Sequence, residues 1–158
     1  MYLPGGAAAR VASICWKWCM QLERSEPMER QYKILVVDDD PDIIEAITTV
    51  LESVEEYDLR TARDGVECIQ AIKEDCPDLL ILDLLMPRMD GFAVVRDLRD
   101  HPRYRDLPIM ILTSVREDAS YRRYELEMGV RMDVQDYIEK PVPPAELMRR
   151  VANLLERG

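Results

Sequence analysis

Two patterns of apolar residues alternate along the chain from Lys33 onward. Short runs in which nearly every residue is apolar alternate with longer segments in which apolar residues recur every three or four positions. The first pattern is typical of strands buried in a parallel sheet, and the second of amphipathic helices. The predicted strands span residues 33–37, 57–62, 79–82, 109–112 and 137–139. Residues 57–62 alternate between apolar and polar, as expected for a strand at the edge of the sheet.

Each predicted strand is followed by a predicted helix, and turn residues mark where several of these helices begin. Asp40-Pro41, Asp64-Gly65 and Asp90-Gly91 each end a strand or loop and precede a helical pattern. The predicted helices span about 43–51, 65–74, 91–100, 118–128 and 143–156. Strict alternation of strands and helices predicts an α/β domain with an open parallel sheet and right-handed crossovers.

The first residues of the chain do not share this pattern. We predict an N-terminal extension over residues 1–30 and a single domain over residues 31–158. Apolar residues of the extension recur at helical spacing between Val11 and Leu22, so a short amphipathic helix and a poorly ordered leader both remain open. Because the last predicted helix runs nearly to the end of the chain, we expect a stand-alone domain without a second effector domain.

Composition excludes several classes of function. The chain has 31 acidic and 21 basic residues, and this surplus of acid disfavours binding to nucleic acid. No run of about 18 apolar residues exists to span a membrane, and the N-terminus does not resemble a signal peptide, so we expect a cytoplasmic protein. With one histidine, His101, and no Cys-x-x-Cys pair, triad chemistry and a Cys/His zinc site lack their residues.

Polar side chains follow the predicted strands at the points where the strands end. Asp38 and Asp39 follow the first strand, Asp83 the third, Thr113 the fourth and Lys140 the fifth. The carboxyl ends of parallel strands meet at one edge of the sheet, where ligands bind, so these side chains should converge. Carboxylates so close repel unless a cation joins them, and a few carboxylates plus water suit Mg²⁺. The sequence therefore predicts a magnesium site there.

The motifs around these positions resemble the receiver domains of two-component response regulators, in particular the stand-alone type found in chemotaxis. The resemblance covers roughly residues 33–156. It rests on ILVVDDD at residues 34–40, DGVE at 64–67, LLILDLLMPRMDG at 79–91, PIMILTS at 108–114 and DYIEKP at 136–141. It implies a flavodoxin-like (βα)5 fold, with strand order 2-1-3-4-5 and helices on both faces of the sheet.

The resemblance also implies a role for each matching residue at the acidic edge. Asp83 matches the aspartate that accepts a phosphoryl group from a histidine kinase or phosphotransfer protein. Asp38 and Asp39 match the acidic pair that holds Mg²⁺, with Asp83 and the backbone carbonyl of Leu85 as further ligands. Lys140 matches the cation that assists transfer. A carboxylate can form an acyl phosphate, and Mg²⁺ with an ammonium would neutralise the phosphoryl oxygens.

Two further residues match the family's conformational switch. Thr113 matches the hydroxyl that follows the phosphoryl oxygen, and Tyr137 matches the switch aromatic whose movement alters docking of a downstream protein, here unknown. The resemblance further implies a cis bond between Lys140 and Pro141. We therefore expect a signalling protein rather than an enzyme, with slow autophosphatase activity at most.

Two departures from the family pattern stand beside the predicted site. Leu85 and Val115 are apolar where the family often has polar or acidic side chains that position the attacking water. We therefore expect slow hydrolysis of the Asp83 phosphate.

Two alternative functions remain to be weighed. The first is a degenerate receiver that acts as a constitutive interaction module, although the intact set of site residues argues against it. The second is a Mg²⁺-dependent phosphohydrolase of small molecules, which would typically have a second acid where Leu85 stands.

Overall fold

The computed structural model describes residues 30–114 and 133–157. Contacts between Cα atoms divide the chain into two units, Met1–Arg30 and Gln31–Gly158, and the described fold is that of the second. The predicted N-terminal extension, apart from Arg30, lies outside the described residues. So do the predicted helix over residues 118–128 and Val115.

The described unit is built on a five-stranded parallel sheet in the order β2-β1-β3-β4-β5, as predicted. The strands are β1 (Tyr32–Val37), β2 (Tyr57–Ala62), β3 (Leu79–Leu82), β4 (Ile109–Thr113) and β5 (Asp136–Glu139). The bounds agree with the sequence pattern to within one residue. The alternating strand β2 lies at an edge of the sheet, with a partner strand on one side only. Its side chains contact both the core and solvent, which agrees with the alternating pattern.

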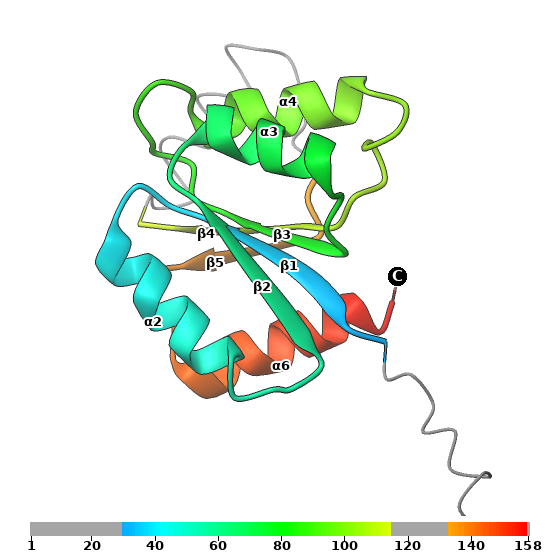
Figure 1. Ribbon diagram of the computed structural model, residues 1–158. Coiled ribbons are helices and arrows are strands. Elements are labelled where there is room, and N and C mark those ends of the chain that lie inside the picture. Colours follow the sequence, from blue (N-terminus) through cyan, green and yellow to red (C-terminus); the bar gives the residue numbers. More distant parts are fainter. Residues whose placement is uncertain (1–29, 115–132, 158) are drawn as a thin grey trace, which may run out of the picture. The chain divides into compact units, whose positions relative to one another are not determined.

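Four helices cover the two faces of this sheet within the described ranges. They are α2 (Pro41–Leu51), α3 (Gly65–Glu74), α4 (Gly91–Asp100) and α6 (Pro144–Leu155). Helices α3 and α4 lie on one face, and α2 and α6 lie on the other (Figure 1). This arrangement confirms the predicted architecture with helices on both faces.

The aspartates predicted to begin helices are N-caps in the structure. Asp40 accepts a hydrogen bond from the backbone N–H of the second helical residue of α2 at 2.9 Å. Asp64 caps α3 by accepting two backbone N–H groups at 2.8 and 3.0 Å, and Asp90 caps α4 with one at 2.8 Å. Each cap satisfies N–H groups that the helix itself leaves unbonded.

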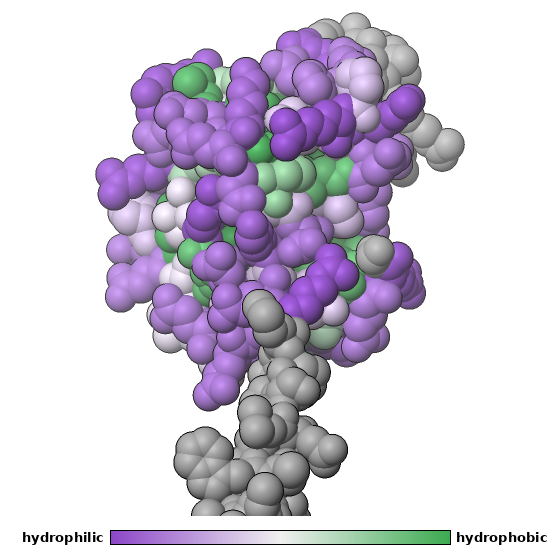
Figure 2. All heavy atoms as spheres, turned by 45° about the vertical axis from the view of Figure 1, so that its right-hand side comes forward, coloured by the Kyte–Doolittle hydropathy of each residue, from purple (hydrophilic) through white to green (hydrophobic). Residues whose placement is uncertain are grey.

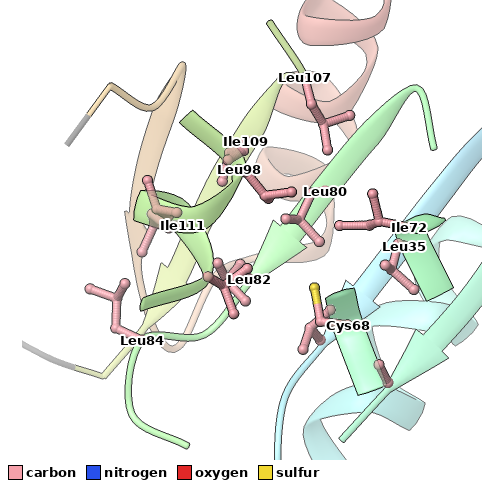
Figure 3. Close-up of a cluster of buried hydrophobic side chains, with 14 of the residues drawn as sticks. Leu35, Cys68, Ile72, Leu80, Leu82, Leu84, Leu98, Leu107, Ile109 and Ile111 are labelled. Carbon is pink, nitrogen blue, oxygen red and sulfur yellow. The ribbon is translucent and has the colours of Figure 1, made fainter. Parts of the chain in front are cut away.

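The strands divide their side chains between two hydrophobic cores because successive residues of a strand point to opposite faces. In β1, Leu35 and Val37 pack under α3 and α4, whereas Ile34 and Val36 pack under α2 and α6. Figure 3 shows the first of these cores, with leucines of β3 between the strands and the two helices. Full burial of one such side chain contributes about 2 kcal/mol to stability, and both cores are built from many of them.

Two of the cysteines lie in the described part of the chain. Both Cys68 and Cys76 are free thiols. Burial raises the pKa of the Cys68 thiol to about 12, so this thiol stays protonated and packs as a small apolar group in the core of Figure 3.

The face shown in Figure 2 is predominantly hydrophilic. In residues 30–114 and 133–157, no helix combines the length and apolar character needed to cross a bilayer.

Candidate functional site

Two aspartates are fixed by hydrogen bonds that extend the sheet one residue past its strands. Asp38 directly follows β1, and its backbone N–H donates to the carbonyl of Ala62 at the end of β2 at 3.2 Å. Asp83 directly follows β3, and its backbone N–H donates to the carbonyl of Val37 at 2.9 Å. The parallel register thus places both carboxylates at the carboxyl edge of the sheet, side by side.

The structure brings four of the predicted site residues together at this edge. Asp38, Asp39 and Asp83 each offer a carboxylate oxygen within 4.8 Å of the others. Asp38 and Asp83 are buried, whereas Asp39 is exposed. The ammonium of Lys140, which follows β5, forms an ion pair with Oδ2 of Asp38 and lies 3.5 Å from Oδ1 of Asp83.

Backbone N–H groups orient the two buried carboxylates toward the lysine. Oδ1 of Asp38 accepts the N–H of Asp40 at 3.0 Å, and Oδ2 of Asp83 accepts the N–H of Leu85 at 3.1 Å. In each carboxylate one oxygen is therefore held by the backbone while the other faces Lys140. Burial of ions is costly unless such partners offset the lost hydration, so this geometry fixes where the charge is placed.

The three carboxylates and one ammonium leave a surplus of negative charge that favours a further cation. All the donor atoms of the acidic cluster are oxygens, which Mg²⁺ prefers, and the exposed Asp39 leaves one side open to solvent. The residues present therefore fit a magnesium ion. Leu85, whose carbonyl is the predicted fourth ligand, is 56% exposed beside the cluster.

The predicted switch residues lie on the two strands next to this cluster. Thr113 is the last residue of β4 and pairs in register with Glu139 of β5. The side chain of Thr113 lies outside the described part of the structure, so the placement of its hydroxyl stays a prediction. Tyr137 of β5 is half-buried and packs against the core under α3 and α4. The bond between Lys140 and Pro141 is cis, as predicted.

Gly91, the first residue of α4, lies directly against the Asp83 backbone. Gly91 donates its N–H to the carbonyl of Leu84 at 2.9 Å. A Cβ atom at Gly91 would lie 2.3 Å from the Asp83 carbonyl oxygen and 2.8 Å from the Leu84 Cα. Only a residue without a side chain can lie this close to the Asp83 backbone. The Asp90-Gly91 motif therefore allows this close contact in addition to starting α4.

The sequence did not reveal one contact that a residue of the loop between β3 and α4 makes with the start of α3. Arg88 adopts a left-handed backbone conformation with a φ of 66° and reaches Asp64, the buried N-cap of α3. The Asp64-Gly65 motif signalled the cap, but nothing in the sequence signals a contact between this cap and an arginine 24 positions further on.

The comparison with protein families matches this chain to the response regulator receiver domain over residues 34–152. Among curated proteins, the response regulator MprA of Mycobacterium ulcerans is 42% identical over 125 residues, which are 79% of this chain and 50% of that protein. The ycf27 protein of Porphyridium aerugineum, whose name describes a transcriptional regulator, is 41% identical over 79% of this chain and 48% of its own length. The chain thus spans about half the length of the curated relatives it matches.

Solved structures of receiver domains share the fold. The receiver domain of a signal transduction histidine kinase from Syntrophus aciditrophicus is 31% identical, with a TM-score of 0.69 over 80% of this chain and 91% of that one. The receiver domain of the sensor histidine kinase PA1611 from Pseudomonas aeruginosa, solved with a magnesium ion in its active-site cleft, is 26% identical, with a TM-score of 0.70 over 80% of this chain and 98% of that one. This chain belongs to the response regulator receiver domain family of two-component systems, whose members are signalling proteins rather than classical enzymes.

Proposed function

We propose that this receiver domain accepts a phosphoryl group on Asp83 from the phosphohistidine of a histidine kinase or phosphotransfer protein. The P–N bond of the phosphohistidine breaks, its electron pair returns to the imidazole, and a P–O bond forms to a carboxylate oxygen of Asp83. The observation that carries the proposal is the placement of a buried carboxylate at a strand end, within reach of Lys140 and of two further carboxylates.

Each residue of the cluster has a separate part in this reaction. The N–H of Leu85 holds Oδ2 of Asp83 and so fixes the orientation of the nucleophile. The ammonium of Lys140 lies where it can neutralise charge on the incoming phosphoryl oxygens. Asp38, Asp39, Asp83 and the Leu85 carbonyl would hold Mg²⁺, which when bound neutralises charge on the transferred group.

The product adds negative charge to a site that already has a surplus of it. Phosphorylation replaces the Asp83 carboxylate with an uncharged acyl group that carries the more strongly charged phosphoryl group, so Lys140 then lies between the Asp38 carboxylate and the phosphoryl oxygens. We propose that Thr113 moves to the phosphoryl group and that Tyr137 of β5 shifts with it, which changes the surface around β5. The output we propose is docking of a partner protein, since the acidic composition disfavours nucleic acid as the direct ligand of this domain.

Two observations weigh against the alternative functions. A degenerate receiver would not need the acidic cluster, which is retained here together with its lysine. A phosphohydrolase of small molecules would typically place an acid two residues after its nucleophile, where this chain has Leu85, which cannot donate a proton.

The test is phosphorylation by acetyl phosphate and Mg²⁺, followed by intact mass. Asp75 pairs with Lys33 at the amino end of β1, away from the acidic cluster, and Asp75→Asn is therefore the matched control. We expect the wild type and this control to gain one phosphoryl group that is lost in alkali. Asp83→Asn should gain none. Modification of Asp83→Asn to the wild-type extent, or an acid-stable label, would overturn the assignment. Multiple turnover of p-nitrophenyl phosphate by the wild type would instead support the phosphohydrolase.

A further inference from the structure

The loop between β3 and α4 begins at Asp83, and two backbone hydrogen bonds hold it in place. Gly91 donates its N–H to the Leu84 carbonyl at 2.9 Å and so closes the loop on itself. Gly65, the first residue of α3, donates its N–H to the Met89 carbonyl at 3.1 Å and joins the loop to the start of that helix. A Cβ at Gly65 would lie 2.6 Å from the same carbonyl oxygen, so the two backbones are in direct contact.

Arg88 adds a charged contact between the same two segments. Its guanidinium forms an ion pair with Oδ2 of Asp64 and lies 3.5 Å from Oε1 of Glu67. The Asp64 side chain is 1% exposed, and its other oxygen, Oδ1, accepts the two backbone N–H groups that begin α3. Arg88 is therefore the cation that neutralises a buried carboxylate, although its own side chain is 62% exposed.

The backbone of Arg88 is held in a conformation that its residue type disfavours. At a φ of 66° the Cβ of an L-residue crowds the backbone, and glycine is the usual occupant. The conformation persists because the surrounding contacts determine it, and the side chain itself contributes the ion pair with the buried Asp64 and the 3.5 Å contact with Glu67.

The segment that Arg88 joins to the loop also supports the other half of the acidic cluster. Ala62, two residues before Asp64, accepts the backbone N–H of Asp38 at 3.2 Å. The contacts thus form a closed path from Asp38 through the turn before α3 and Arg88 to Asp83. The register of β1 and β3 places the backbones of Asp38 and Asp83 side by side, and this path adds a second connection, which holds the loop after Asp83.

We propose that Arg88 is a positioning residue, whose ion pair with Asp64 fixes the loop after β3 so that Asp83 and the Leu85 carbonyl keep the arrangement that binds Mg²⁺. The inference rests on the proposed function of the acidic cluster. In this proposal Arg88 contacts neither the metal ligands nor the phosphoryl group. It affects Mg²⁺ binding through the backbone of the loop. Groups that hold metal ligands in place commonly change affinity roughly tenfold or more when they are removed.

The primary test is the Mg²⁺ dissociation constant of the unphosphorylated protein, measured by titration calorimetry. We expect Arg88→Ala to weaken Mg²⁺ binding roughly tenfold and Arg88→Lys to recover part of the affinity. Arg63→Ala is the matched control, because it removes the same charge from an exposed arginine next to Asp64. Equal weakening in the control would show a general charge effect and overturn the proposal, as would unchanged affinity in Arg88→Ala.

A glycine variant separates the ion pair from the backbone conformation. Arg88→Gly removes the side chain but relieves the crowding at positive φ, so it should fold at least as well as Arg88→Ala. We expect the Mg²⁺ affinity of Arg88→Gly to be as low as that of Arg88→Ala, because both lack the ion pair. Wild-type affinity in Arg88→Gly would overturn the proposal, since the backbone alone would then place the loop.

Phosphorylation by acetyl phosphate gives a second readout in the same samples. In Arg88→Ala the Mg²⁺ concentration for half-maximal rate should rise by the same factor as the dissociation constant, while the rate at saturating Mg²⁺ stays near that of the wild type. A lower saturating rate with unchanged Mg²⁺ dependence would contradict a positioning role. If the wild type itself is not modified at Asp83, the proposed function fails, whereas the titration still decides whether Arg88 supports the metal site.

Discussion

Strand β1 has a lysine–aspartate ion pair at each of its ends, and the two pairs differ in their access to water. At the amino end, Nζ of Lys33 lies 2.8 Å from Oδ1 of Asp75, and the side chains are 43% and 45% exposed. At the carboxyl end, Lys140 lies between Asp38 and Asp83, and the three side chains are 16%, 4% and 5% exposed. The residue types are the same, so burial and the number of carboxylates make the difference.

This difference separates a surface contact from the candidate functional site. Water screens the exposed pair, which joins β1 to the residues after α3 and contributes little to stability. At the carboxyl end the charges are held where hydration is poor, so their interactions are strong and a missing partner is costly. An incoming cation or phosphoryl group therefore has a large effect at the carboxyl edge, whereas a similar charge at the amino edge would have almost none.

The largest contrast is expected from removing each lysine. Lys140→Ala leaves two buried carboxylates without their cation, so it should abolish phosphorylation and lower the free energy of unfolding by about 3 kcal/mol without Mg²⁺. Lys33→Ala should leave phosphorylation intact and shift the urea midpoint little. Addition of Mg²⁺ should restore part of the stability of the Lys140 variant. Equal effects of the two substitutions on stability would contradict the difference between the two ends of β1.

A smaller effect is expected from crowding the backbone at the carboxyl edge. Gly91→Ala places a Cβ 2.3 Å from the Asp83 carbonyl oxygen, and this backbone cannot move without moving Asp83, the proposed acceptor. We expect a loss of about 1–3 kcal/mol in urea unfolding and slower phosphorylation. A variant with wild-type stability and rate would show that the loop after β3 adapts freely.

The rate at which the Asp83 phosphate is hydrolysed tests the solvent-exposed side of the carboxyl edge of the sheet. Leu85→Asn supplies a hydrogen-bonding group that can position water, so the Asp83 phosphate should decay about tenfold faster than in the wild type. Val66→Asn is the matched control, since Val66 is the other large apolar residue that is exposed in the described ranges. Decay measured after removal of acetyl phosphate decides the matter, and an unchanged rate in Leu85→Asn would exclude this residue as the determinant.

The smallest effect is expected from the pair at the amino end, and it should depend on pH. The hydrogen bond from Lys33 lowers the pKa of Asp75 below its usual 3.8. A lowered folded-state pKa stabilises the fold above about pH 4, and this contribution is lost as the pH falls through the lowered pKa. Asp75→Asn should therefore be slightly less stable than the wild type at pH 7, and the difference should vanish in strong acid. A difference that grows on acidification would have the wrong sign.

The parts of this molecule that could be predicted from sequence are those that local patterns determine. The apolar runs of β3 and β4 and the capping aspartates of α2, α3 and α4 gave the element bounds, because burial and capping each select particular residue types. The convergence of Asp38, Asp83 and Lys140 followed from strand order, since parallel strands end at one edge. Their predicted roles came from family resemblance, and they stay predictions here.

The contact between Arg88 and Asp64 could not be predicted in this way. The contact joins two segments far apart in the sequence and depends on a positive φ at an arginine. It also involves a buried carboxylate, which the sequence indicated only as a helix N-cap. Local propensity favours a glycine or asparagine at such a φ, so nothing in the sequence indicated the conformation.

The central claim is that the buried carboxylate at the carboxyl end of β3 accepts the phosphoryl group, and the most direct measurement identifies the modified residue. Borohydride reduces an acyl phosphate of aspartate to homoserine, which mass spectrometry of peptides can locate in the chain. After phosphorylation by acetyl phosphate and Mg²⁺ and reduction by borohydride, we predict homoserine at position 83. Asp38, Asp39 and Asp75 should remain aspartate. Homoserine at any of those other positions, with Asp83 unchanged, would contradict the claim.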